Sequence, residues 1–197
     1  MEAKMNIRNV YKAVQGRGIL IGKPCIHVEF GKGQIFTPEQ IAMKVSEQRG
    51  SYVCLCGDEP LKDMEEMGAL LEALKKRGKF VTLETNGTIY TDLKFDFITI
   101  CPEPLKPYDK ELMNYFLSLS IKVQVIFKVG ERALDTLHWC EGFVKDFTVV
   151  RKKKVPLLFY PEPNEVKAFK AVSVILFNTH WLKAYNHRVM LDISRLP

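Results

Sequence analysis

The stretch Val53-Cys54-Leu55-Cys56-Gly57-Asp58-Glu59-Pro60-Leu61 decides how this chain is organised. An apolar run enters it and ends at a glycine, two acids and a proline, after which a helical pattern begins. In a parallel α/β sheet, ligands bind where a strand ends and its crossover helix has yet to start. Gly57 permits close approach of the backbone, and Glu59 is expected at the mouth of the sheet. By itself, a tight strand-to-helix loop is the simpler interpretation, so the rest of the chain has to decide.

Length and composition indicate one globular domain, residues 1–197, with 47% hydrophobic and 26% charged residues. No apolar run approaches the ~18 residues of a membrane span, and the polar N-terminus does not resemble a signal peptide, so we expect a cytoplasmic protein without a membrane partner. The net charge of +6 permits RNA or a larger assembly as a partner but does not demand one. The sharpest basic run, 151–154, is interpreted as a solvated turn between strands.

The five cysteines are scattered along the chain, which argues against a disulfide framework. No CxxC or CxxxCxxC spacing is present. Cys54 and Cys56 are two residues apart on an expected strand, so both should face the same side. They are interpreted as small apolar core residues, and His27 as a satisfied sheet residue, so no metal ligand is predicted from the residues themselves.

Strands and helices alternate along the chain, which predicts an α/β fold: a mainly parallel sheet with right-handed crossover helices. Gly31-Lys32-Gly33 is expected to break the chain after the second strand. Thr37-Pro38-Glu39-Gln40 carries a capping box and predicts a helix start. The expected strands are 5–15, 24–30, 52–56, 80–84, 95–101, 123–129, 147–150, 155–160 and 188–193, and the expected helices are 37–50, 64–78, 108–118, 134–143 and 165–185.

Several segments, in order, carry a resemblance to one family. Leu83-Glu84-Thr85-Asn86-Gly87-Thr88 matches "LETNGT" without change, and 55–61 is similar to "TGGEPL". Weaker matches are 11–18, which resembles "xSxQGEG", 22–30, which resembles "GxPxxFVRL", 98–102, which resembles "ITVSPK", and 159–164, which falls where the family has "QPxxN". Together they resemble the 7-carboxy-7-deazaguanine synthase family of radical SAM enzymes, which implies a partial TIM-barrel-like radical SAM fold.

The resemblance implies a lyase of queuosine and deazapurine biosynthesis that contracts the ring of 6-carboxy-5,6,7,8-tetrahydropterin. It implies S-adenosyl-L-methionine (SAM), a [4Fe–4S] cluster and Mg²⁺ as cofactors, a pterin or nucleotide-like ligand, and a homodimer. No catalytic residue is assigned. The residues implied in holding SAM are Gly57, Asp58, Glu59, Glu84, Thr85, Asn86 and Cys101. The residues implied in holding the substrate are Gln15, Arg17, Glu29 and Pro197.

The departures from the family pattern leave two hypotheses open. The family's CxxxCxxC cluster loop is missing after Phe30. Arg17 stands for a glutamate, Glu29 for an arginine, Asp58 for a glycine and Glu103 for a lysine. Under the first hypothesis the protein is a radical SAM lyase of this family, which requires a cluster loop that this sequence lacks. Under the second it is a cluster-less pseudoenzyme that binds a ligand or acts as a scaffold on the same sheet.

Overall fold

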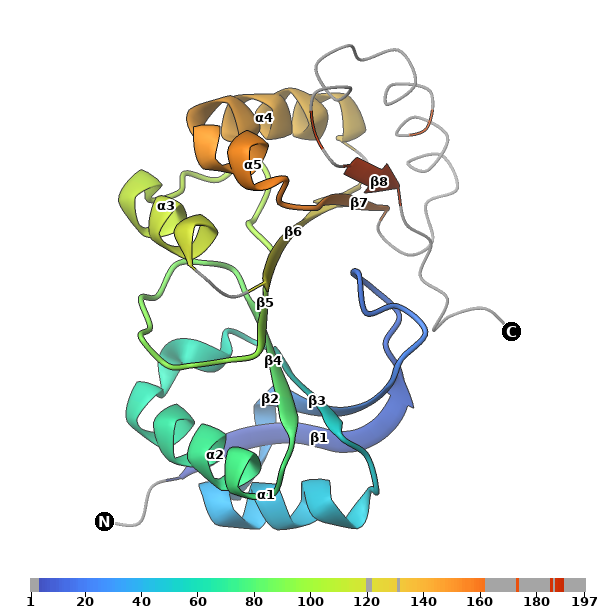
Figure 1. Cartoon of the computed structure of the whole chain (residues 1–197), viewed down its shortest axis with the longest axis vertical. Coiled ribbons are helices and arrows are strands. Elements are labelled where there is room, and N and C mark those ends of the chain that lie inside the picture. The colour runs from blue at the N-terminus through green and yellow to red at the C-terminus, as the bar shows by residue number, and fades with distance from the viewer. Residues whose placement is uncertain are drawn as a thin grey trace. The chain divides into compact units, whose positions relative to one another are not determined.

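The computed structural model describes residues 4–119, 122–130, 132–161, 173, 185 and 187–189. The chain forms two compact units (Figure 1). The first unit contains Met1–Gln15, Leu20–Thr85 and Ile89–Thr99, and the second contains Gly16–Ile19, Asn86–Thr88 and Ile100–Pro197. The expectation of one domain stays a prediction.

The strands of the first unit lie side by side in chain order. Strands β1 and β2 pair antiparallel, whereas β2, β3 and β4 pair parallel, as the alternation of strands and helices predicts. Helices α1 and α2 provide the crossovers and lie next to each other (Figure 1). The elements are β1 (Met5–Val14), β2 (Pro24–Phe36), α1 (Pro38–Glu47), β3 (Tyr52–Gly57), the short 3₁₀ helix η1 (Pro60–Lys62), α2 (Met64–Lys76), β4 (Phe80–Thr85) and β5 (Phe97–Ile100).

One face of β2, β3 and β4 forms the core of this unit. Successive side chains on a strand point to opposite faces, so every second residue contributes to it. These core residues are completely buried, and so is the apolar stripe of each covering helix. They are Ile26, Val28, Val53, Leu55, Val81 and Leu83 on the strands, and Ile41, Val45, Met67, Leu70 and Leu74 on the helices. The opposite face of the same strands is therefore left for polar and sulfur-containing side chains.

The prediction that Gly31-Lys32-Gly33 ends the second strand is wrong. Strand β2 continues to Phe36, and β1 pairs with both parts of it. Ile7 is paired with Phe30 and also with Gln34, so the residues between them form a bulge. Glycine is required there because a Cβ on Gly33 would lie 2.2 Å from the carbonyl oxygen of Ile7.

The described strands of the second unit, β6, β7 and β8, are parallel and again follow chain order. Its elements are α3 (Lys110–Ser118), β6 (Lys122–Val129), α4 (Ala133–Asp146), α5 (Thr148–Lys153), β7 (Leu157–Pro161) and β8 (His187–Val189). The predicted helix over 165–185 lies outside the described residues, apart from two isolated positions. Within the described ranges, no helix has the length and apolar character that crossing a bilayer requires.

The strand predicted over 147–150, and with it the basic turn over 151–154, is wrong. Residues 148–153 form helix α5, which begins at Thr148 and ends at Lys153. Phe147 and Val150 are both buried, and the N–H of Val150 donates to the carbonyl of Phe147 at 3.0 Å. Two apolar residues three apart lie on one face of a helical turn, whereas in a strand they would point to opposite faces. That spacing favours a helix, although the β-branched residues of the segment favour a strand.

Thr37 begins α1 with the capping box that the sequence predicts. Its hydroxyl accepts from the N–H of Gln40 at 3.3 Å, and the Gln40 side chain accepts from the N–H of Thr37 at 2.8 Å. We expect Thr37→Ala to lower the free energy of unfolding by about 1 kcal/mol, because the N–H of Gln40 loses its side-chain acceptor. Urea denaturation measures the change. Thr37→Ser keeps the hydroxyl and should stay near the wild type, and an equal loss in both variants would contradict the cap.

Candidate functional site at the ends of strands β3 and β4

Strand β3 ends in a close backbone contact with β2. Gly57 has φ +104°, and a Cβ placed on it would lie 2.3 Å from the carbonyl oxygen of Phe30. The next N–H, that of Asp58, donates to the same carbonyl at 3.0 Å. Only glycine fits this approach, so Gly57 has a structural reason to be present besides its predicted place in a SAM loop.

Asp58 and Glu29, two substitutions relative to the family pattern, share one cation. Arg8 on β1 donates to Glu29 Oε1 at 2.8 Å and to Asp58 Oδ1 at 3.2 Å. These hydrogen bonds raise the pKa of the Arg8 guanidinium. Glu29 and Asp58 thus both form ion pairs with Arg8. Arg8 therefore offsets part of the negative charge that these two carboxylates bring to the loop.

Glu59 and Thr85 join the ends of β3 and β4. The Thr85 hydroxyl donates to Glu59 Oε1 at 2.8 Å, and the N–H of Leu61 donates to the same oxygen at 3.2 Å. Glu59 therefore also caps the short helix η1. The polar groups that follow β3 and end β4 therefore meet at one edge of the sheet.

Glu84 lies on the face that the helices leave uncovered. Its Oε1 accepts from Gln15 Nε2 at 3.3 Å, and Gln15 is 7% exposed. Gln15 is placed by two backbone hydrogen bonds, from its own N–H to the Lys23 carbonyl and from the Gly22 N–H to its carbonyl. Glu84, which the resemblance implies in SAM binding, is therefore hydrogen-bonded to Gln15, which the resemblance implies in substrate binding.

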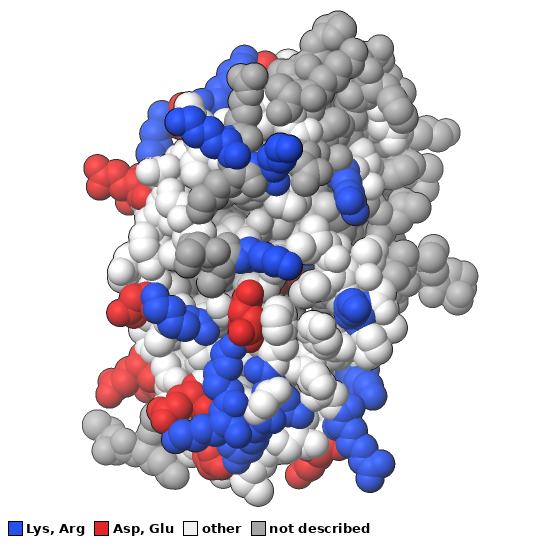
Figure 2. Space-filling view, viewed as in Figure 1, with Lys and Arg blue, Asp and Glu red and all other residues white. Residues whose placement is uncertain are grey.

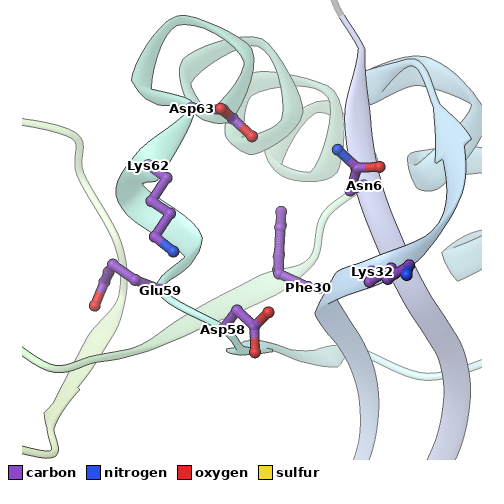
Figure 3. A pocket seen from close by; sticks show the side chains of 8 residues that line it. Asn6, Phe30, Lys32, Asp58, Glu59, Lys62 and Asp63 are labelled. Atoms are coloured by element: carbon purple, nitrogen blue, oxygen red, sulfur yellow. The ribbon is translucent and has the colours of Figure 1, made fainter.

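An open cavity of about 410 Å³ adjoins the Glu59 loop. Figure 3 shows that the Glu59 side chain extends away from the other labelled side chains. Both acidic and basic side chains line the cavity, which is formed by Asn6, Phe30, Gly31, Lys32, Asp58, Glu59, Lys62 and Asp63. On the face drawn in Figure 2, acidic side chains also lie among the basic ones, so the net charge of +6 is not gathered there into a surface of one sign.

Three residues of the predicted set belong to the second unit. Arg17 lies over the ring of Tyr160, with its guanidinium carbon 5.5 Å from the ring centre. Asn86 accepts from the N–H and the hydroxyl of Thr88, which closes a turn. Cys101 packs against a buried cluster that includes Tyr160. Pro197 lies outside the described residues. The roles of all four in binding stay predictions.

The sequence interpretation missed a cluster of sulfur and imidazole groups on the uncovered face of β2 and β3. His27, Cys54 and Cys56 offer ligand atoms that all lie within 4.8 Å of one another. Burial raises the pKa of the neighbouring Cys25 thiol to about 12, and hydrogen bonding with Cys56 together with burial raises that of Cys54. The signal in the sequence was the two-residue spacing of Cys25 and His27, matched by that of Cys54 and Cys56.

The residues after Phe30 do not fit the [4Fe–4S] cluster that the family resemblance implies. An iron–sulfur cluster needs thiolate ligands, usually four cysteines. Here β2 continues through its glycine bulge to Phe36, and no cysteine lies between Phe30 and Thr37.

Comparison with known proteins identifies the family and the fold. No protein-family model matches the chain. A 7-carboxy-7-deazaguanine synthase of Methanospirillum hungatei is 33% identical over 159 residues, covering 71% of this chain and 67% of that protein. One of Haemophilus influenzae is 28% identical over 124 residues, covering 56% of this chain and 58% of that protein. The chain thus spans little more than half the length of the second relative.

Solved structures identify the fold of the chain. QueE from Escherichia coli matches with a TM-score of 0.70 at 14% identity, over 95% of this chain and 94% of that one. Streptococcus suis SuiB bound to S-adenosylmethionine matches with a TM-score of 0.53 at 12% identity, over 77% of this chain and 40% of that one. The mainly parallel α/β sheet is therefore the radical SAM fold. The chain belongs to the 7-carboxy-7-deazaguanine synthase family.

Replacing Gly57 tests the backbone contact that positions the loop. Gly78→Ala is the matched control, because Gly78 also has positive φ, +68°, but has open space where its Cβ would lie. The control should cost about 1–2 kcal/mol for the left-handed conformation. Gly57→Ala should cost at least about 1 kcal/mol more, because its Cβ meets backbone. Equal losses of unfolding free energy in urea would contradict the close contact.

Proposed function

We propose that this chain has a 7-carboxy-7-deazaguanine synthase-like function, in which the first unit binds SAM at the ends of β3 and β4. The observation that carries the proposal is the hydrogen-bonded pair of Glu59 and Thr85, which lies where the family motifs "GEP" and "ETNGT" meet. The family relatives and the neighbour bound to S-adenosylmethionine support it.

The groups at this edge suit SAM chemically. The Glu59 carboxylate would accept from the amino group of the methionine part. The Glu84 carboxylate, on β4 next to the same loop, would accept from ribose hydroxyls. The close backbone approach at Gly57 leaves the end of β3 free of any side chain at that position. The ion pair with Arg8 offsets part of the negative charge that Asp58 brings in place of the family's loop glycine.

The substrate of the proposed function is a pterin or a related bicyclic ring. Gln15 directly follows β1, and Glu29 lies on β2. Both carry groups that can form hydrogen bonds with the edge of a ring. Glu29 is held by Arg8, so a substrate that needs this carboxylate would compete with that ion pair. No reaction step is assigned to an iron–sulfur cluster, because the residues after Phe30 do not fit one.

Two substitutions at Glu59 distinguish its role in ligand binding from its role in holding the loop. SAM at ~100 times its Kd should stabilise the wild-type protein by about 2.7 kcal/mol, seen as a thermal shift. Glu59→Gln keeps an acceptor oxygen for Thr85 and Leu61 but removes the charge, so the ligand-free melting temperature should stay near the wild type while the SAM-induced shift falls. Glu59→Ala should lose both.

The same experiment defines failure of the proposal. The control is Glu72→Gln, an exposed carboxylate on α2 paired with Lys76 and remote from the loop, which should keep the full SAM response. Equal SAM shifts in the wild type and in both Glu59 variants would place the ligand elsewhere. No response of the wild type to SAM or to 6-carboxy-5,6,7,8-tetrahydropterin would overturn the proposal.

A further inference from the structure

Two parallel strands bring sulfur and imidazole ligands together on one face of the first unit. His27 on β2 is the register partner of Cys54 on β3, and Glu29 is the partner of Cys56. The alternation of side chains puts all four on the face opposite the buried core. The candidate ligand atoms of His27, Cys54 and Cys56 lie within 4.8 Å of one another, and Cys56 Sγ is 3.9 Å from His27 Nδ1.

These separations suit a single small cation. Around one tetrahedral zinc ion, sulfur lies about 2.3 Å and nitrogen about 2.0 Å from the metal, so ligand atoms are about 3.5–3.8 Å apart. The Cys56–His27 pair is already close to that separation, and no pair in the set exceeds it by more than about 1.3 Å. Side-chain rotation closes such a gap without moving either strand. Thiolate and imidazole together favour zinc over magnesium or calcium, which prefer oxygen.

The surroundings hold the ligands in place and bury the two thiols. Tyr11 on β1 stacks on the His27 ring, with centres 5.2 Å apart and planes 12° from parallel. Cys54 is 1% exposed and Cys56 is 7% exposed. Two thiolates neutralise a divalent ion, which removes the cost of burying an unpaired charge. Cys25 belongs to the same buried cluster, but its thiol is directed to the carbonyl of Ile26.

The alternative is a patch of small apolar residues, as the sequence analysis interprets Cys54 and Cys56. The helix-covered core lies on the other face, where Val53 and Leu55 are completely buried. The cysteines instead share their face with His27 and lie close enough to Glu84 for its charge to affect Cys54. An iron–sulfur cluster fits less well than one ion, because its ligands bind different irons and so lie further apart.

We propose that His27, Cys54 and Cys56 form a mononuclear site for a zinc-like divalent cation on the uncovered face of β2 and β3. Three protein ligands leave a fourth position, which is the pattern of zinc sites that bind water or substrate. The site goes beyond the proposed SAM function: its ligands lie within the strands, whereas Glu59 and Thr85 lie at their ends.

Cobalt titration tests the site, because Co²⁺ reports its ligands spectroscopically where Zn²⁺ is silent. We expect the reduced, chelator-treated protein to bind one equivalent of Co²⁺ with a sulfur-to-cobalt charge-transfer band and the visible bands of tetrahedral cobalt, and Zn²⁺ to displace it. Cys56→Ala and Cys54→Ala should weaken the charge-transfer band and lower affinity at least tenfold. Cys140→Ala, which removes a buried cysteine of α4 in the second unit, is the matched control and should keep the spectrum.

His27→Phe keeps the proposal testable if a buried cysteine variant fails to fold. It preserves an aromatic ring against Tyr11 but removes the nitrogen ligand, so its circular dichroism should match the wild type while the Zn²⁺-induced thermal shift disappears. A folded wild type that binds Co²⁺ without charge transfer would overturn the site. So would an unchanged spectrum in the Cys54→Ala/Cys56→Ala double variant. The proposal of a single ion would also be wrong if the protein takes up iron and sulfide and the same cysteine substitutions abolish this uptake, because the site would then hold a cluster.

Discussion

The contact between Gly57 and the carbonyl of Phe30 fixes how β3 leaves the sheet, and the candidate site depends on it. A side chain at Gly57 would overlap the backbone of β2, so this position admits glycine alone. The contact brings the N–H of Asp58 onto the same carbonyl and starts the turn into η1. Glu59 then reaches Thr85 on the neighbouring strand. A loop feature typical of ligand sites is thus also a packing requirement of the fold.

Side-chain alternation gives the sheet of the first unit one apolar face under the helices and one face that carries the candidate functional residues. Every second residue of β2, β3 and β4 is apolar and sealed beneath α1 and α2, which supplies the hydrophobic driving force. The residues between them lie on the opposite face and include histidine, cysteine, threonine and glutamate, of which the cysteines form a small buried cluster of their own. A one-residue change of register would exchange the two faces, so the core holds the polar face in place.

Much of this arrangement could be predicted from the sequence because it follows local patterns. The capping box at Thr37, the α2 stripe and the buried β3 run each lie within a few residues of chain. The continuation of β2 could not, because Gly31 and Gly33 mark turns as readily as bulges, and only pairing with Ile7 distinguishes the two. The partnership of His27 with Cys54 was equally hidden, since the register of two strands separated by a helix depends on tertiary packing.

The departures from the family pattern are physically coupled rather than scattered. Removing a cluster loop after Phe30 allows β2 to continue, and the glycine bulge absorbs the mismatch against β1. Arg8 lies beside that bulge and holds both substituted carboxylates, Glu29 and Asp58. Two carboxylates so close together would repel each other, and Arg8 offsets this repulsion because it donates to both of them. Arg8 and Glu29 lie on strands, and strand-borne side chains are held more precisely than those of a loop.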